Sequence, residues 1–234
     1  MQVRWHGHAC YSIVTSAGRS LLIDPFITDG PSRRGLDAFA PDLVLVTHAH
    51  NDHVGDALDL GAPILSTHEL AIQLAQRGAD ATGMGIGGFT QMADTRIWCA
   101  PANHSSAWDR DETLLPGGKP CGFVIDDGTT RFYHTGDTGI FGDMRTVIRD
   151  LLQPHVAAVP IGDHYTMGVE HAARAVEWLG VDVATPMHYD TFDKIRADPK
   201  RFEALVGTHA QVVVPAVDGG FEMQSSRLIR LLEP

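Results

Sequence analysis

The stretch that most constrains this chain runs from Leu43 to His53. It begins with four consecutive apolar β-forming residues, Leu-Val-Leu-Val, which predict a buried strand. The next residues are Thr-His-Ala-His-Asn-Asp-His, so three imidazoles and a carboxylate follow directly where the strand ends. Loops held by a rigid sheet often carry function, and imidazole and carboxylate are good ligands for divalent metals. The stretch therefore predicts a metal site, and the alternative is a polar surface turn with incidental histidines.

The spacing inside this segment divides its side chains into two pairs. His48 and His50 stand two residues apart, so an extended or turning backbone can aim both imidazoles at one ion. Asp52 and His53 follow on the next bend and would serve a second ion. The segment is therefore interpreted as part of a site for two metal ions.

Several other predicted strands also deliver polar side chains where they end. The strands are expected at residues 96–100, 131–134, 156–161 and 183–186. The side chains that follow them are His104, Asp137, Asp163 with His164, and His188 with Asp190. Strand and helix segments alternate along most of the chain, with helices expected at 56–60, 69–76, 169–179 and 199–207, so the fold class is mixed α/β. A further strand is expected at 211–215, and residues 227–232 are the last strand or helix.

Composition narrows the function further. The chain has 234 residues, 44% of them hydrophobic and 20% charged, which is ordinary for a globular enzyme. Its formal charge of −11 argues against a nucleic-acid surface, which needs a basic patch. Thirteen histidines are many for this length, so some of them need a role beyond packing.

The cellular compartment is predicted from the cysteine pattern and from the absence of long apolar segments. Its three cysteines, Cys10, Cys99 and Cys121, are odd in number and widely spaced, and they are interpreted as buried apolar residues in a reducing environment. No apolar run approaches the length of a membrane span, and the N-terminus shows no secretory apolar region. A cytoplasmic protein without a membrane span is expected.

The metal motif and the later segments together resemble one protein family. Thr47 to His53 looks like the signature of the metallo-β-lactamase superfamily. The closer resemblance, over nearly the whole chain, is to its ascorbate-6-phosphate lactonase-like branch and, within that branch, to the uncharacterised UPF0173-like metal-dependent hydrolases. The segments that carry it are 86–88, 101–106, 136–139, 160–168 and 186–192. One departure is Asp190, where Asn is more usual in the family.

The resemblance implies a fold and a ligand set. The fold is a four-layer αββα sandwich of two face-to-face sheets, made by residues 1–234 as a single domain, whose two halves (about 1–115 and 116–234) each offer strands and helices. By position, His48, His50 and His104 match a three-histidine site, and Asp52, His53 and His188 match a second site. Asp137 matches the carboxylate that bridges both ions, and Asp52 and Asp137 are the implied catalytic residues. Two cations so close together repel unless anions lie between them, which is the role of such a bridge.

The implied activity is hydrolysis by a metal-bound hydroxide. Two divalent ions are expected, with zinc preferred and manganese or iron as alternatives. The expected substrate is a small ester, lactone or phosphoester, and a homo-oligomer is left open. The alternatives are a nuclease of the same superfamily and a non-catalytic metal-binding or scaffold protein.

The sequence leaves the roles of five residues open: His8, Asp24, Asp163, His164 and Asp190. Asp24 is either a partner of the metal ligands or a turn residue, His8 is a pocket or loop histidine, and His164 is taken as pocket wall rather than ligand.

Overall fold

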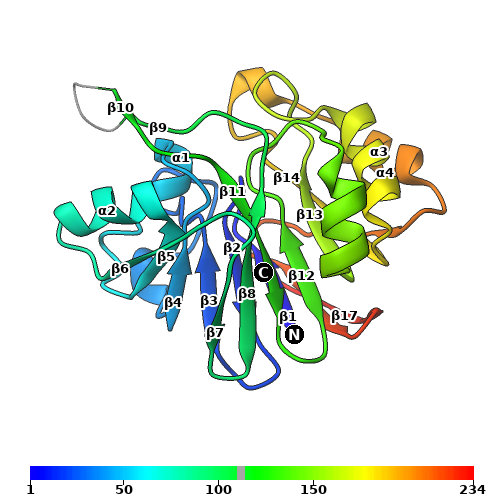
Figure 1. Cartoon of the computed structure of the whole chain (residues 1–234). Coiled ribbons are helices and arrows are strands. Elements are labelled where there is room, and N and C mark those ends of the chain that lie inside the picture. The colour runs from blue at the N-terminus through cyan, green and yellow to red at the C-terminus, as the bar shows by residue number, and fades with distance from the viewer. Residues whose placement is uncertain (110–113) are drawn as a thin grey trace.

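The computed structural model describes residues 1–109 and 114–234. Two large sheets pack face to face, and helices cover the outer side of each sheet (Figure 1). In that view α2 (His68–Gln76) lies outside one sheet, whereas α3 (Val169–Leu179) and α4 (Pro199–Val206) lie on the opposite side of the molecule. This is the four-layer αββα arrangement of a mixed α/β protein, as the resemblance implied.

The first sheet has eight strands in the order β17-β16-β1-β2-β3-β4-β5-β6. Its strands are β1 Gln2–Trp5, β2 Tyr11–Val14, β3 Ser20–Ile23, β4 Leu43–Leu45, β5 Ile64–Thr67, β6 Ala81–Met84, β16 Gly220–Gln224 and β17 Arg227–Leu232. The strands from β3 to β6 run parallel, while β1, β2, β16 and β17 pair antiparallel.

The second sheet has seven strands in the order β15-β14-β13-β12-β11-β8-β7. They are β7 Phe89–Met92, β8 Thr95–Pro101, β11 Cys121–Asp126, β12 Arg131–His134, β13 Val156–Pro160, β14 Val183–Met187 and β15 Gln211–Val212. The strands from β12 to β15 are parallel neighbours. A separate two-stranded pair is formed by β9 Ala107–Trp108 and β10 Leu115–Pro116.

The helices are short, and α2, α3 and α4 cover the sheets from outside (Figure 1). They are α1 Asn51–Val54, α2 His68–Gln76, α3 Val169–Leu179 and α4 Pro199–Val206. Two 3-10 turns, η1 Leu36–Ala38 and η3 Asp193–Ile195, and a helix with π-type turns, η2 Met144–Leu152, complete the fold. No helix in the described ranges is long and apolar enough to cross a membrane.

Strand β4 contributes side chains to two hydrophobic cores, one on each of its faces. Successive side chains of a strand point to opposite faces. Leu45 packs into the large core between the two sheets, while Val44 packs into a smaller core shared with Leu70 and Leu74 of α2. A strand that is buried on both faces reads as a continuous apolar run, which is the pattern of Leu43 to Val46.

The two sheets do not coincide with the two halves of the sequence. Strands β7 and β8 from the first half belong to the second sheet, and β16 and β17 from the end of the chain return to pair with β1. Pairing over such distances is set by tertiary structure, so the local pattern did not reveal it. The segment 227–232, left open between strand and helix, is strand β17.

Two local predictions were also wrong, and one helix was missed. The helix expected at 56–60 lies instead at Asn51–Val54, and Gly55, with φ 44°, ends it. Asp56 follows this helix, and its carboxylate accepts the backbone N–H groups of Ile27 and Thr28. The strand expected over 211–215 is only Gln211–Val212, and helix η2 was not predicted.

Candidate metal centre

Strand direction explains why the predicted ligands meet. Strand β8 is antiparallel to β11, and β11 is antiparallel to β12, so β8 runs in the same direction as β12 and its parallel neighbours. Their carboxyl ends therefore share one edge of the sheet. The loops at that edge carry His104 after β8, Asp137 after β12 and His188 after β14. The loop after β4 and helix α1 of the facing sheet supply the other four residues, His48, His50, Asp52 and His53.

The ligand atoms of all seven residues converge in three overlapping groups. One group is His48, His50 and His104, a second is His48, His53 and Asp137, and a third is Asp52, His53 and His188 together with His8. Within each group the atoms lie within 4.8 Å of one another. The structure thus brings together every predicted ligand and adds His8.

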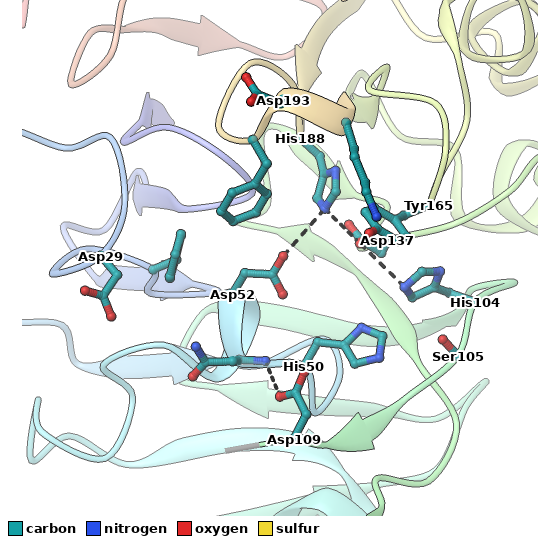
Figure 2. Close-up of a pocket in the computed structure, with 14 residues that line it drawn as sticks. Asp29, His50, Asp52, His104, Ser105, Asp109, Asp137, Tyr165, His188 and Asp193 are labelled. Atoms are coloured by element: carbon teal, nitrogen blue, oxygen red, sulfur yellow. Dashed lines mark hydrogen bonds and ion pairs between the residues drawn. The ribbon is translucent and has the colours of Figure 1, made fainter. Parts of the chain in front are cut away.

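Asp137 belongs to the group that shares His48 with the first group and His53 with the third. Its Oδ2 atom is 3.0 Å from Nε2 of His188, 3.4 Å from Nε2 of His53 and 3.6 Å from Nε2 of His104. Figure 2 shows Asp52, Asp137 and His188 pointing toward one another across the pocket. One carboxylate in reach of three imidazoles from separate loops has the placement that a bridge between two cations needs.

Unpaired buried atoms test whether the residues fit metal ions. Oδ1 of Asp137 and Nε2 of His53 are buried and have no hydrogen-bond partner within the described part of the chain. Buried polar atoms nearly always have a hydrogen-bond partner, so two unpaired atoms in one cluster need another kind of partner. A divalent cation satisfies both, and the imidazole and carboxylate donors are those that zinc, manganese and iron accept. The residues therefore fit the metal that the resemblance implied.

The electrostatics hold most of these groups in the forms that coordinate metals. Burial lowers the pKa of His48, His50 and His104, which keeps these imidazoles neutral. Burial alone would raise the pKa of Asp137, but the imidazoles of His188 and His53 hold it well below its ordinary value. It is therefore a carboxylate at neutral pH.

His53 differs from the other histidines. Its burial favours the neutral form, yet the carboxylates of Asp137, Asp24 and Asp52 raise its pKa well above the ordinary value. Without a cation in the cluster, a proton on this imidazole balances the surrounding negative charge. A cation bound there would take over that role, since metal binding displaces protons from its ligands.

Asp24 contacts the candidate ligand His53 as well as shaping a turn. Its carboxylate lies 2.7 Å from Nδ1 of His53 and accepts the backbone N–H and the hydroxyl of Thr47. Its φ of 45° places it at the sharp bend before Pro25. Both readings of Asp24 from the sequence therefore hold.

The other open residues lie away from the ligand cluster. Asp163 and His164 are exposed in a turn with positive φ, and His164 packs against the ring of Tyr165. The prediction that His164 forms the pocket wall was wrong, since Tyr165 takes that position. Asp190 accepts the backbone N–H of Ala197 and so ties its own loop together.

A pocket of about 760 Å³ opens above the cluster (Figure 2). Its size suits a small molecule. Apolar or aromatic surface comes from three side chains, and polar surface comes from the metal cluster, several carboxylates and one lysine. These lining residues are Phe26, Tyr165 and Phe192; His50, Asp52, His104, Asp137 and His188; Asp29, Asp109 and Asp193; Asn51 and Ser105; and Lys194. Phe26 and Lys194 were not predicted from the sequence, because only folding places them beside the candidate ligands.

Comparison with known proteins identifies the family. The model of the Beta-lactamase superfamily domain matches residues 2–188. UPF0173 metal-dependent hydrolases from Methanobrevibacter smithii and Thermoplasma acidophilum are 41% and 40% identical to the chain. The first match covers 88% of this chain and 89% of the relative, and the second covers 95% and 99%. The chain belongs to the UPF0173 metal-dependent hydrolases of the metallo-β-lactamase superfamily.

Solved structures agree with this membership. Igni18, a novel metallo hydrolase from Ignicoccus hospitalis, is 37% identical, with a TM-score of 0.82 over 98% of both chains. An isothiocyanate hydrolase from Delia radicum gut bacteria has a TM-score of 0.75 at 18% identity, over 96% of this chain and 100% of that one, which shows a shared fold alone. The UPF0173 chain is thus a metal-dependent hydrolase, as the resemblance implied.

Proposed function

We propose that this chain is a dinuclear hydrolase that cleaves a small ester, lactone or phosphoester. The observation that carries the proposal is the position of Asp137 between two groups of ligand atoms, with one of its oxygens buried and unpaired. His48, His50 and His104 would hold one ion, and Asp52, His53 and His188 would hold the other. When bound, two such ions lower the pKa of a water molecule and polarise a carbonyl or phosphoryl oxygen.

The chain's own residues would position the two ions and the substrate for this chemistry. Asp137 is 3% exposed, so its charge is little screened by solvent, and it would hold the two sites together. Asp52 is 26% exposed at the pocket floor, where it would both bind a cation and face the substrate. The rings of Phe26, Tyr165 and Phe192 line the pocket and would cover the apolar part of a substrate while excluding water.

Further features of the function follow from the same observations. Ligands come from loops of both sheets, which supports residues 1–234 acting as a single catalytic domain. Zinc suits the imidazole-rich donor set best, with manganese or iron as alternatives. The three cysteines are buried and free, in keeping with a cytoplasmic location. The net charge of −11 and the carboxylates at the pocket favour a small-molecule substrate over a nucleic acid, and so argue against the nuclease alternative.

Metal stoichiometry of ligand variants tests the two-ion site. The wild-type chain, stripped of metal and reconstituted with zinc, should hold two ions by elemental analysis. His104→Ala and His188→Ala should each lose one ion, since each removes a ligand of a different site. His171→Ala, which changes an exposed histidine on α3, should keep two. A wild-type chain with fewer than one ion, or two ions in both ligand variants, would contradict the proposal.

A substrate panel tests the reaction class. The reconstituted protein should hydrolyse at least one of a p-nitrophenyl ester, a lactone and bis-p-nitrophenyl phosphate, and His188→Ala should lose that activity. The β-lactam nitrocefin should be a poor substrate. Efficient turnover of nitrocefin with the other three inert would overturn the proposed substrate class, and a fully loaded protein inert toward every hydrolysable compound would favour the scaffold alternative.

A further inference from the structure

We propose that His8 is a positioning residue that fixes the Asp52 carboxylate in the orientation needed for the second metal group. The proposal rests on the proposed function, because it assigns Asp52, His53 and His188 to one ion. His8 itself would not bind that ion. It would act through the hydrogen bond that joins its ring to Asp52.

The backbone of His8 is anchored to the loop that carries His188. The carbonyl oxygen of His8 accepts the backbone N–H of His188 at 2.9 Å and the indole N–H of Trp5 at 2.9 Å. Residue 8 has a φ of 52°, an uncommon conformation for a residue with a side chain, and the side chain is fully buried. These contacts fix the position of the ring relative to His188, whose ring centroid is 4.1 Å away.

Both nitrogens of the His8 ring have partners. Nε2 lies 3.0 Å from Oδ2 of Asp52, and Nδ1 lies 3.0 Å from Oγ1 of Thr191. A carboxylate only accepts hydrogen bonds, so the proton must be on Nε2. The Thr191 hydroxyl lies 3.0 Å from Nδ1 and 3.5 Å from the carbonyl oxygen of Tyr189, and donating to Nδ1, the shorter contact, favours this tautomer. A nitrogen that carries a proton toward a carboxylate has no lone pair left for a metal, so the geometry favours positioning over direct ligation.

Asp52 needs such a partner because little else holds it. It lies on the single-turn helix α1, and its side chain is 26% exposed to the pocket. Its Oδ1 is 3.9 Å from Nε2 of His53, and its Oδ2 is 4.0 Å from Nε2 of His188. With Oδ2 held by His8, the carboxylate cannot rotate toward solvent, and Oδ1 stays directed at His53. Partners that orient a ligand in this way typically change metal affinity by about 10–100-fold.

Three variants separate the positioning role from other roles. His8→Leu removes both ring hydrogen bonds, so the affinity for one zinc ion should fall by about 10–100-fold while the other ion stays bound. His8→Gln should remain within a few fold of wild type, because its amide N–H can reach the position of Nε2. Thr191→Val removes only the partner of Nδ1 and should fall between them. His171→Gln serves as the control on an exposed histidine.

The readouts are zinc stoichiometry, zinc affinity by chelator competition, and thermal unfolding of the metal-free variants. If His8 had only a structural role, replacing it would lower the unfolding temperature and weaken the binding of both ions alike. His8→Gln would then not restore the binding of one ion selectively. If His8→Gln binds zinc as weakly as His8→Leu, His8 is a ligand and the proposal is overturned. Wild-type zinc affinity in a folded His8→Leu would also overturn the proposal. If His8→Leu does not fold, unchanged affinity in Thr191→Val would overturn it. A wild-type chain that takes up fewer than one ion would instead overturn the proposed function and the role of His8 with it.

Discussion

The Nδ1 atom of His53 lies 2.7 Å from Oδ2 of Asp24, and both side chains are fully buried. This pairing directs the other ring nitrogen, Nε2, toward Asp137 at 3.4 Å. The same carboxylate holds the end of β4 through the backbone N–H and the hydroxyl of Thr47. Asp24 therefore connects the end of strand β3 to the orientation of His53, a candidate metal ligand 29 residues later in the sequence.

Replacing Asp24 with asparagine should weaken metal binding more than folding. Asp24→Asn keeps the size of the side chain but removes the charge that makes His53 a stronger donor. Zinc affinity should fall by about 10–100-fold, as measured by chelator competition. Asp59→Asn, on the exposed turn after α1, is the matched control and should bind zinc like wild type. Equal affinities in the two variants would show that the Asp24 pairing does not tune His53.

Gly136 should be intolerant of a side chain although Gly139, three residues later, is not. Gly136 has a φ of 61°, and a Cβ there would lie 2.4 Å from the carbonyl oxygen of Cys121. The left-handed backbone alone costs an alanine about 1–2 kcal/mol, and relieving the clash would displace the adjacent Asp137. A Cβ at Gly139 would meet only Asn103 at 3.8 Å. Gly136→Ala should therefore lose stability and metal, measured by urea unfolding and elemental analysis. Loss of both in Gly139→Ala as well would contradict this reasoning.

The ligands close together in sequence were the most predictable part of the site. His48, His50, Asp52 and His53 follow one buried strand, so the local pattern alone indicated a metal centre. His104, Asp137 and His188 also follow strands, but only the family resemblance connected them to the first four. Their convergence depends on strand direction in the second sheet, which no local pattern records.

The parts that the sequence did not predict are those set by distant contacts. The hydrogen bond of His8 to Asp52 exists because strands far apart in order share one sheet edge, and the spacing of the two residues gives no sign of it. The helix at Asn51–Val54 consists of residues with modest helix propensity, so tertiary contacts rather than propensity place it. Strand β16 was not predicted from the sequence, and its pairing with β1 defines it in the structure.

Asp127 should make stability depend on pH in the acid range. Burial opposes its ionisation, but hydrogen bonds from the backbone of Thr130 and Ser16 and from Thr129 lower its pKa below the ordinary value. The unfolded chain has a pKa of about 3.9 at such a residue. The stabilisation is therefore complete above that value and is lost as pH falls through the lower folded pKa.

Asp127→Asn isolates this contribution. At pH 7 it should lower the free energy of unfolding by about 1–3 kcal/mol, because it removes a charged acceptor of buried N–H groups. The difference should shrink as the pH is lowered from 7 to about 3, below the unfolded pKa. The measurement is urea unfolding at both pH values, and contributions from the metal-site groups cancel because the two proteins share them. A difference between the proteins that stays constant with pH would show that Asp127 does not titrate in this way.

Lys194 should select substrates that carry a negative charge. It is the one lysine or arginine among the described residues that line the pocket. The neighbouring carboxylate of Asp193 pairs with Arg196 at 2.6 Å, and Lys194 has no ion-pair partner in the described ranges. An ammonium group without a partner at the edge of a pocket can accept the free carboxylate or phosphate of a substrate. A hydrogen bond to a charged group contributes about 1.5–3 kcal/mol.

The test compares two p-nitrophenyl esters of equal length, one ending in a carboxylate and one neutral. Lys194→Ala should lower kcat/KM for the charged ester roughly tenfold or more, since about 1.4 kcal/mol corresponds to a factor of ten. Most of the change should be in KM, because the side chain would bind the ground state and the transition state alike. The neutral ester should be hydrolysed at the wild-type rate. Lys200→Ala, on α4 and outside the pocket lining, is the matched control for loss of an exposed positive charge. Equal losses for the two esters in Lys194→Ala would mean that Lys194 shapes the pocket without recognising charge.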